Sequence, residues 1–479
     1  MKRNEFFQQR EGRSLKPDDI TLNTKFVEFV PKQISLATRF SRNVTLKVPL
    51  VSAAMDTVTE ARMAIAMARW GGMGIIHRNL TPHKQAEEVD RVKNACKFGL
   101  IEQPICVFED ETVESIDRRR EEKQYHFHSF LVIERLIGRL VGVFTGQDRR
   151  FCKSLAVQVR EVMTRNPVTG IFGDTTVVQA FEKMREKKIK VLPLISTLGT
   201  VRGLWTLADV ERMLAQSVPD NFGSDGRYQV AAAIGLLGVD KDTEERVALL
   251  VDKHVDVLKI DMAHAGTAAA VETVKWIKCI YPVDVVPGNV SEESATRHLL
   301  EAGADGIMVG QSPGSVCKSK QVKGTGLALA TAVYKCAQIT EKCDVPLGAD
   351  GGLWHPGDIV KVLAIGASFA VCGRRFAGTE ESPGDVIEDE ETGLRKKLYR
   401  GMGSLGAMRD RMNMGSRERY LQNDMEELVA EGFETEVPYV GPAEKITKTL
   451  AGGIRKGMFE IGAYDIPSLR IEADFYEEQ

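Results

Sequence analysis

Short apolar strands that alternate with amphipathic helices constrain the fold of this chain more than any other feature. Eight stretches have the length and composition of buried strands; these are Val48–Ser52, Gly71–His77, Gln229–Ile234, Val255–Ile260, Asp284–Pro287, Gly306–Val309, Pro346–Ala349 and Phe369–Cys372. Helical periodicity fills the intervals between them, as in Thr59–Trp70, where Thr59 is the predicted N-cap. Eight parallel strands with helices between them predict an α/β TIM barrel.

The alternation stops near residue 98 and resumes near Tyr228, and the interval contains an internal repeat. Gly142–Asp148 matches Gly203–Asp209, with a threonine and an aspartate that recur at a constant offset of 61 residues. The pattern strand–helix–strand–strand–helix occurs twice, and matched repeats usually pack as a pseudo-symmetric unit. The sequence therefore predicts a barrel encoded by residues 1–98 and 223–479, with an inserted domain at 99–222.

The inserted repeat resembles a tandem cystathionine-β-synthase (CBS) domain pair, or Bateman domain. This resemblance implies that the repeated threonines and aspartates line ribose and phosphate sites for adenine or guanine nucleotides. The alternative is a CBS pair whose nucleotide clefts are empty.

Composition and charge argue against several classes of protein. The chain has 479 residues, 43% hydrophobic and 27% charged, with a formal net charge of -3. This charge predicts no bulk attraction to nucleic acid or to an anionic membrane. No apolar run reaches the roughly 18 residues that span a bilayer, and the N-terminus lacks the apolar segment of a secretory signal. Eight cysteines without a CxxC pair favour a reduced, cytoplasmic setting over a zinc site or a disulfide framework.

Polar and glycine-rich loops follow six of the predicted strands. In a TIM barrel, the loops after the carboxyl ends of the strands form the active site. The loops of interest contain Met55-Asp56, Asp261–Gly266, Gly288–Val290, Gly310–Ser319, Asp350–Gly352 and Gly373–Arg375. Their glycines allow a ligand to approach the backbone closely. The sequence therefore predicts one ligand site at one end of the barrel.

The loop within Val309–Ser319 holds the main chemical candidate. Two glycines and a proline prevent regular structure there, so backbone N–H groups and the Ser315 hydroxyl can bind an anion. Cys317 stands at the far end of the loop, where its thiol would serve as a nucleophile. The alternative interpretation is a strand-to-helix turn with a buried cysteine.

Charged residues in two further loops complete the predicted site. Arg374 and Arg375 follow Gly373, at a position where TIM barrels often hold a phosphate. Asp350 stands before two glycines, where its carboxylate can bind the two hydroxyls of a ribose. The alternative for Asp350 is a carboxylate that only shapes a turn.

A long polar segment follows the last predicted strand. It spans about residues 401–436, and it is too polar to be core and too long for a tight turn. Because an apolar helix, Ile446–Ile454, comes after it, we interpret the segment as a mobile lid, or flap, that returns to the barrel. Arg419 and Tyr420 lie in this flap. An arginine acts as a base only where burial and neighbours lower its pKa.

Together these segments resemble the inosine-5′-monophosphate (IMP) dehydrogenase / GMP reductase family over nearly the whole chain. The matching segments are Ser52–Glu60, Gly288–Val290, Gly314–Cys317, Ala349–Gly352 and Tyr399–Ser404. The inserted repeat and the Arg419-Tyr420 pair make the resemblance closer to the dehydrogenases than to the reductases.

The resemblance implies a reaction and a set of site residues. Cys317 thiolate adds to C2 of IMP, hydride passes to NAD+, and water activated in the flap hydrolyses the covalent thioimidate (E-XMP*) to xanthosine monophosphate (XMP). The implied catalytic residues are Cys317, Ser319, Arg419, Tyr420 and Glu431. The implied substrate-binding residues are Met55, Asn289, Ser315, Asp350, Gly351, Gly352, Gly373, Arg374, Tyr399, Gly401, Met402, Gly403 and Glu431. The resemblance also implies that Asp261, His264 and Gly310 bind NAD, and that carbonyls of Gly310, Ser312 and Cys317 bind K+.

The sequence departs from the family pattern at four places. Ser319 stands where the family has a threonine, and Gln311–Pro313 replaces a glycine-containing run beside the implied K+ site. Arg374 replaces a serine or glycine in the implied phosphate pocket, where it could bind the phosphate in a bidentate pair or fill the pocket. Met262 and Ala265 change the loop on which NAD+ would rest.

Two alternative functions remain open from the sequence. A GMP reductase would use the same barrel with NADPH to deaminate GMP to IMP, and Arg419 would then matter little. A non-catalytic nucleotide-sensing relative would bind purine nucleotides without turnover. The family resemblance further implies a homotetramer that can stack into octamers.

Overall fold

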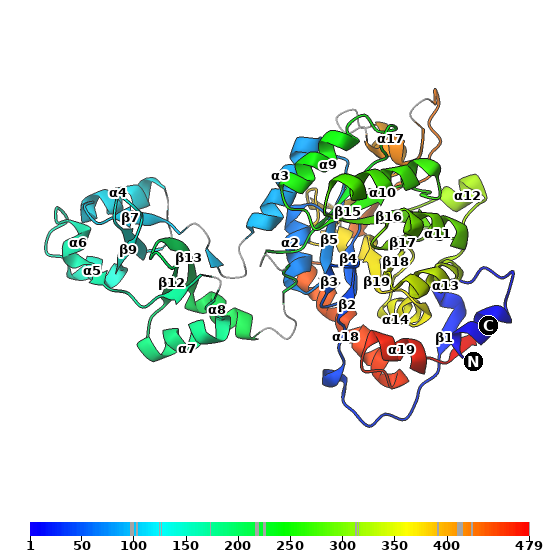
Figure 1. The fold of residues 1–479 in the computed structure, drawn as a ribbon, viewed down its shortest axis with the longest axis horizontal. Helices are drawn as coiled ribbons and strands as arrows, with labels where there is room; N and C mark the ends of the chain where they lie inside the picture. Colours follow the sequence, from blue (N-terminus) through cyan, green and yellow to red (C-terminus); the bar gives the residue numbers. More distant parts are fainter. Residues whose placement is uncertain are drawn as a thin grey trace. The chain divides into compact units, whose positions relative to one another are not determined.

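The chain divides into two units, and the larger of them contains the barrel (Figure 1). The larger unit consists of Met1–Ala95 and Val218–Gln479, and the smaller of Cys96–Ser217. The structure, a computed structural model, describes residues 1–95, 100–101, 104–123, 125, 127–172, 174–215, 220–223, 227–311, 314, 316–389, 392–409, 415–422 and 425–478. Among these residues, no helix is both long enough and apolar enough to cross a membrane.

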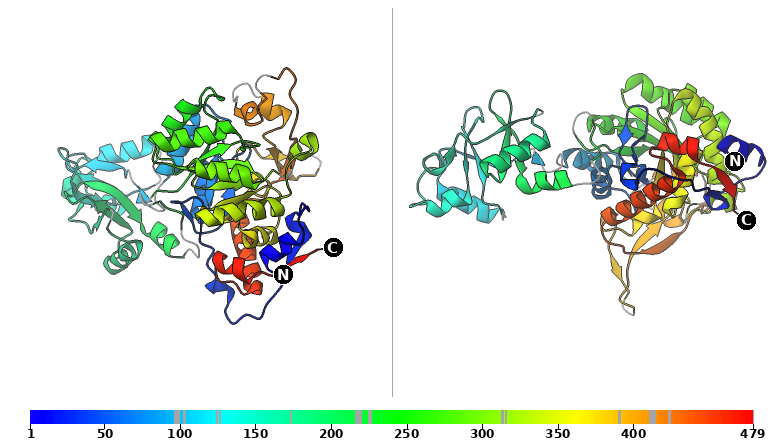
Figure 2. Two further views of the ribbon diagram at one scale, coloured as in Figure 1. Left: turned by 45° about the vertical axis from the view of Figure 1, so that its right-hand side comes forward. Right: turned by 90° about the horizontal axis from the view of Figure 1, so that it is seen from below.

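Eight parallel strands close into a barrel, which confirms the predicted TIM fold. Around the barrel they follow the order β14-β15-β16-β17-β18-β19-β4-β5. Their bounds are β4 Leu50–Ser52, β5 Met73–Ile76, β14 Ala231–Ile234, β15 Val257–Asp261, β16 Asp284–Val290, β17 Ile307–Val309, β18 Leu347–Asp350 and β19 Phe369–Cys372. The helices that surround the strands (Figure 2) are α2 Ala61–Arg69, α3 Pro82–Asn94, α9 Thr243–Asp252, α10 Ala268–Ile280, α11 Glu293–Glu301, α13 Leu329–Thr340, α14 Pro356–Ile365 and α18 Ala443–Ile461.

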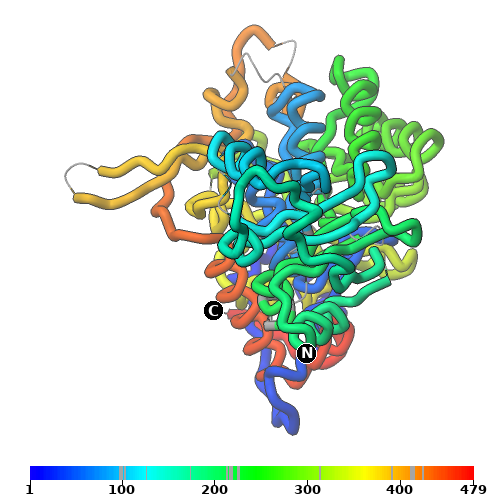
Figure 3. Tube along the Cα trace, turned by 90° about the vertical axis from the view of Figure 1, so that its left-hand side faces the viewer, coloured from blue at the N-terminus to red at the C-terminus, as the bar shows by residue number. Residues whose placement is uncertain are grey.

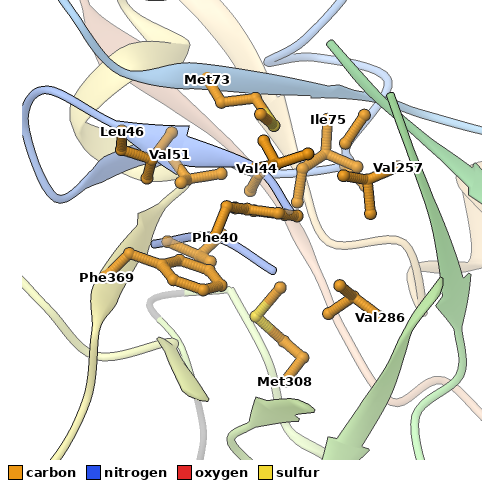
Figure 4. Packing of buried hydrophobic residues seen from close by; sticks show 14 of the residues in the cluster. Phe40, Val44, Leu46, Val51, Met73, Ile75, Val257, Val286, Met308 and Phe369 are labelled. Carbon is orange, nitrogen blue, oxygen red and sulfur yellow. The ribbon is translucent and has the colours of Figure 1, made fainter. Parts of the chain in front are cut away.

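Apolar side chains fill the barrel interior (Figure 4). Successive residues of a strand point to opposite sides, so a strand gives alternate residues to this cluster, such as Met73 and Ile75 of β5 or Phe369 and Val371 of β19. A short hairpin of β2 (Thr38–Arg39) and β3 (Thr45–Leu46) adds to it, and the Phe40 ring between these strands stacks on Phe369 at 4.5 Å. The interior is therefore closed by packed side chains at this level, and a ligand must enter from the carboxyl ends of the strands.

The first predicted N-cap is wrong. Helix α2 begins at Ala61 with Glu60 as its N-cap, and the Glu60 side chain makes no capping bond. The first N–H of the helix, that of Ala61, donates instead to the Glu88 carboxylate at 2.8 Å. The hydroxyl of Thr59 is instead fully buried, and it donates to the Ala53 carbonyl at 2.7 Å and contacts the Ser52 hydroxyl at 2.9 Å. A buried carbonyl needs a hydrogen-bond donor more than a helix end near the surface does.

Several short elements complete the larger unit. An antiparallel pair joins the two ends of the chain, β1 (Ile20–Leu22) with β23 (Phe475–Glu477). A three-stranded sheet contains β20 (Ile387–Glu388), β21 (Arg395–Arg400) and β22 (Glu434–Pro438), and its β20–β21 hairpin projects from the rest of this unit (Figure 3). The predicted flap lies between β21 and β22, which pair side by side. Smaller helices are α1 Arg3–Gln8, α12 Ser319–Lys323, α15 Arg374–Ala377, α16 Leu405–Arg409, α17 Gly415–Arg419 and α19 Ile466–Glu472.

The smaller unit contains two similar four-stranded sheets, with orders β10-β9-β8-β7 and β11-β12-β13-β6. The strands are β6 Leu100–Ile101, β7 Cys106–Phe108, β8 Phe130–Ile133, β9 Leu140–Phe144, β10 Thr164–Arg165, β11 Gly170–Ile171, β12 Val191–Ile195 and β13 Val201–Thr206. The helices are α4 Val113–Glu122, α5 Gly146–Phe151, α6 Val159–Val162, α7 Val177–Lys187 and α8 Leu207–Ala215. Leu131 and Val143 of one sheet share a buried cluster with Leu204 of the other, so the two repeats pack on each other.

The threonine and aspartate that recur in the two repeats have a structural role. In the first repeat, Thr145 donates to the Asp148 carboxylate at 2.8 Å and accepts from its backbone N–H at 3.3 Å. Thr206 and Asp209 make the same pair of contacts, at 2.5 and 3.3 Å. Both pairs cap the start of a helix. Their predicted role in nucleotide binding remains a prediction.

Candidate functional site

A cavity of about 480 Å³ lies at the carboxyl ends of the barrel strands, a size suited to a small ligand. Most of the predicted site residues line it, namely Met55, Asp261, His264, Asn289, Gly310, Cys317, Ser319, Asp350, Gly351, Gly352, Gly373, Arg374, Tyr399, Gly401, Met402, Gly403, Arg419, Tyr420 and Glu431. Ser312 and Ser315 lie outside the described residues. Residues from six strand ends and from the flap thus come together around one space.

Cys317 lies half-buried in the wall of this cavity, and its Sγ contacts the Ser319 hydroxyl at 3.3 Å. Its loop is held against the end of the flap, because the Lys318 N–H donates to the Glu431 carbonyl at 2.7 Å. Two buried thiols, Cys336 and Cys372, are less available. Burial raises the pKa of Cys336 and of Cys372 to about 12, so their reactive thiolate forms are scarce at neutral pH. The interpretation of Cys317 as a cysteine buried in a turn is therefore wrong.

Asn289 ties together the ends of three neighbouring strands. Its amide nitrogen donates to the Gly310 carbonyl and to the Asp350 carboxylate, each at 2.8 Å. Gly310 has a φ of +150°, and a Cβ there would lie 1.9 Å from the Asp350 carbonyl oxygen, so only glycine fits. Burial raises the pKa of Asp350, although Lys259 and the Asn289 amide oppose this. Asp350 thus presents its carboxylate to the cavity.

Asp261 is bound on both carboxylate oxygens. Lys259 Nζ contacts Oδ1, and Arg419 Nη1 of the flap contacts Oδ2. Burial alone would lower the pKa of Arg419, but Asp261 and the other acidic groups around it together outweigh burial, and the pKa is raised. Burial also raises the pKa of Tyr420. The condition for Arg419 to act as a base is therefore not met while it is paired with Asp261.

Two guanidinium groups at one end of the cavity have no carboxylate partner among the described residues. Arg374 lies over the Trp354 ring at 4.9 Å, and Arg375 Nε is buried without a hydrogen bond. The other cations that line the cavity are paired, as in the 2.9 Å contact between Lys323 and Glu431. The Arg374–Arg375 end therefore has an excess of two positive charges, which suits a doubly charged phosphate.

Tyr399 closes the cavity beside these arginines. Its hydroxyl lies 3.8 Å from Met55 Sδ, and a Cβ at Gly373 would lie 2.9 Å from the same hydroxyl. A side chain at Gly373 would therefore fill space that a ligand could use. Tyr399 and Gly373 remain predicted substrate-binding residues.

A buried cluster that the sequence did not predict holds the flap helix α17. Arg78 Nη1 contacts Asp240 Oδ2 at 2.6 Å and Glu418 Oε2 at 3.6 Å. The Arg78 guanidinium thus contacts both carboxyl groups. Burial and the nearby Asp240 carboxylate raise the pKa of Glu418 to about 8. Glu418 is therefore largely protonated in this arrangement at neutral pH.

The predicted cofactor loops have their own contacts. His264 Nδ1 lies 2.8 Å from the Gln311 side-chain amide, which orients the imidazole in the wall of the cavity. Arg419 occupies Oδ2 of Asp261, and NAD binding at Asp261, His264 and Gly310 remains a prediction. The Gly310 carbonyl, a predicted K+ ligand, accepts the Asn289 amide. The K+ site remains a prediction.

The fold and the cavity define a class of TIM-barrel protein in which a thiol from the loop after β17 and an arginine from the flap line one cavity. The family described as "IMP dehydrogenase / GMP reductase domain" matches residues 14–478. The chain belongs to this family, and it is an IMP dehydrogenase-like oxidoreductase.

Individual relatives agree with this assignment. The chain is 41% identical to an inosine-5′-monophosphate dehydrogenase of Halalkalibacterium halodurans over 98% of its own length and 93% of the relative. It is also 41% identical to an enzyme of the same name from Aquifex aeolicus, over 96% and 91%. Among solved structures, a GMP reductase variant of Trypanosoma brucei in complex with guanosine 5′-monophosphate has a TM-score of 0.81 at 32% identity, covering 99% of this chain and 97% of that one.

Proposed function

We propose that this protein catalyses the NAD+-dependent oxidation of IMP to XMP. The observation that carries the proposal is that Cys317, Arg419 and Tyr420 line the same cavity. A thioimidate on Cys317 must be hydrolysed, and hydrolysis needs a group that activates water. The reductase reaction that the family also includes has no such need. The flap pair therefore supports the dehydrogenase, as do the names of the relatives in sequence.

The residues that line the cavity match the phosphate, the ribose and the purine of a nucleotide in turn. The unpaired charges of Arg374 and Arg375 balance the two charges of a phosphate monoester. Asp350, held by Asn289 at 2.8 Å, accepts hydrogen bonds from the ribose hydroxyls. The purine then lies toward Cys317, with Met55 among the lining residues on the barrel side.

The chemistry follows from this placement. The Cys317 thiolate forms a bond to C2, and the hydride at C2 leaves with its electron pair. Asp261 and His264 would hold NAD+, which would supply the acceptor for that hydride. Water then adds to C2, the C2–S bond breaks, and the thiolate is regenerated as XMP forms. Because Asp261 raises the pKa of Arg419, we place the proton transfer from water in a state where these two side chains are apart.

A spectrophotometric assay tests the proposal. IMP and NAD+ should give NADH with the wild-type protein, and Cys317→Ala should abolish it. The control is Cys279→Ala, which changes an exposed thiol outside the cavity and should leave the rate unchanged. A wild-type protein that forms no NADH would reject the proposal.

GMP reduction is the second candidate, and the similarity to the T. brucei GMP reductase favours it. It predicts that GMP drives the oxidation of NADPH with release of ammonia. Arg419→Ala should then have little effect, whereas in a dehydrogenase it should slow the steady-state formation of XMP. Nucleotide binding with turnover of neither substrate pair would instead indicate a non-catalytic sensor.

We further propose that the insert at 99–222 is a CBS pair that regulates the barrel through adenine or guanine nucleotides. Its two repeats pack around a shared cluster, and a solved structure of the T. brucei GMP reductase is described as a complex with guanosine 5′-triphosphate. Calorimetry with ATP and GTP on the full chain tests the idea. Binding that persists after residues 99–222 are removed would contradict it.

The predicted assembly is likewise a proposal, namely a homotetramer that stacks into octamers. Light scattering coupled to gel filtration should give four chains without nucleotide. A monomer at micromolar concentration would contradict it.

A further inference from the structure

A lysine lies inside the barrel, directly beneath the cavity. All five residues of β15 are buried, and the alternation of side chains along a strand places Val257, Lys259 and Asp261 on one face. Val257 belongs to the apolar interior cluster, whereas Lys259 and Asp261 line the cavity above it. The Lys259 side chain is only 3% exposed. An ammonium group at such a depth requires a specific partner.

Two carboxylates and two cations meet at this point. Lys259 contacts Asp261 Oδ1, Arg419 contacts Oδ2, and both cations also attract the Asp350 carboxylate. The charge on Asp261 makes the ionisation of Asp350 less favourable, and the reverse also holds, because like charges in a poorly solvated site repel. Each carboxylate therefore depends on a nearby cation to remain charged.

The two cations differ in how they are held. Lys259 projects from the barrel strand β15, and its position is fixed by the fold. Arg419 belongs to the flap, and it contacts Oδ2 of Asp261. Under the proposed function, a dinucleotide bound at Asp261 competes with this contact. Whenever Arg419 leaves, Lys259 is the nearest cation that stays.

We propose that Lys259 is a positioning residue, a fixed counter-ion that keeps Asp261 and Asp350 charged and oriented while Arg419 is out of the cavity. This inference rests on the proposed function, because it assigns Asp261 to the dinucleotide and Asp350 to the nucleotide ribose.

The charges around the pair support this role. Burial raises the pKa of Asp261, but Arg419 and Lys259 outweigh it and the pKa is lowered. Burial raises the pKa of Asp350, with Lys259 the largest opposing influence. Burial lowers the pKa of Lys259 itself, against the pull of Asp261. The other titratable or charged groups that face these three side chains are Arg78, Cys317, Cys372, Arg419, Tyr420 and Glu431.

Three variants of the full-length protein test the inference. Lys259→Met removes the charge at nearly constant length, and Lys259→Arg keeps it. Lys93→Met is the matched control, because Lys93 is 1% exposed and pairs with Asp256 at 2.6 Å but does not line the cavity. The measurements are IMP binding by calorimetry and kcat/KM for NAD+, each from about pH 5.5 to 9.

In Lys259→Met we expect the acid limb of both pH profiles to move to a higher pH by about one unit or more. At pH values below the limb, this shift means at least a tenfold loss in IMP affinity and in kcat/KM for NAD+. Lys93→Met should keep the wild-type profiles. Lys259→Arg should keep the acid limb and lose less binding at alkaline pH, since an arginine does not deprotonate there. This second expectation still tests the idea if the methionine variant fails to fold.

The results separate the inference from the proposed function. Wild-type protein that binds neither IMP nor NAD+ would overturn both. Wild-type protein that turns over IMP, with an unchanged acid limb in Lys259→Met, would overturn the role of Lys259 alone. An unchanged alkaline limb in Lys259→Arg would do the same.

Discussion

Docking of the flap helix α17 should weaken as pH rises, because the Glu418 carboxyl group lies beside the Asp240 carboxylate and both contact the same cation, Arg78. The pKa of Glu418 is raised from 4.5 to about 8 in the docked flap. A raised carboxyl pKa means that the docked state binds a proton which the undocked state releases. The contribution to docking is therefore fully present below about pH 4.5, and it is lost as pH rises through about 8.

The magnitude follows from the linkage between proton binding and docking. Within this window the ratio of docked to undocked flap falls by up to about tenfold for each pH unit. Between pH 6 and pH 7.5 the expected loss is thus roughly thirtyfold at most. Glu418→Gln keeps the shape and the hydrogen-bonding capacity of a protonated glutamate, so docking in this variant should not titrate.

Hydrogen–deuterium exchange of residues 415–422 provides the assay. The ratio of wild-type to Glu418→Gln exchange removes the intrinsic pH dependence of the amides, and it should rise with pH across the window. Glu426→Gln changes an exposed residue elsewhere in the flap. It is the control, and it should behave like the wild type. A ratio that stays flat from about pH 5 to 8 would refute the reasoning.

Three further outcomes are expected. Arg374→Ser should raise KM for IMP by roughly tenfold to a hundredfold, the range for a lost hydrogen bond to a charged group, with a smaller change for NAD+; equal changes would contradict the phosphate assignment. Arg419→Ala should still give a burst of NADH but slow the following turnover, since only hydrolysis uses the flap; loss of the burst would count against this division. Ser319→Ala should slow the burst, whereas Ser319→Thr should keep it; stopped-flow absorbance distinguishes these cases.

The barrel itself was predictable because its signals are local. Strand length, apolar composition and strand-end glycines recur in each unit of the fold, and parallel strands bring their ends together whatever the loops contain. The predicted residues after β4, β15, β16, β17, β18 and β19 therefore meet at one cavity.

The network beneath the site needed contacts that the sequence does not encode locally. Arg419 meets Asp261 across 158 residues, and nothing in the flap sequence indicates that contact. The sequence does carry a signal for Lys259, because its two-residue spacing from Val257 and Asp261 places it on the interior face. The apolar composition of β15 alone does not reveal that position. The N-cap prediction at Thr59 was wrong for the opposite reason. Threonine is a good N-cap residue by local criteria, but the Thr59 hydroxyl donates to the buried Ala53 carbonyl instead.

The most direct test of the central claim is intact-protein mass spectrometry after an acid quench of the reaction with IMP and NAD+. A covalent purine nucleotide adduct that maps to Cys317, and that Arg419→Ala increases, is the predicted result. Formation of NADH without any adduct, or an adduct on another cysteine, would contradict the account.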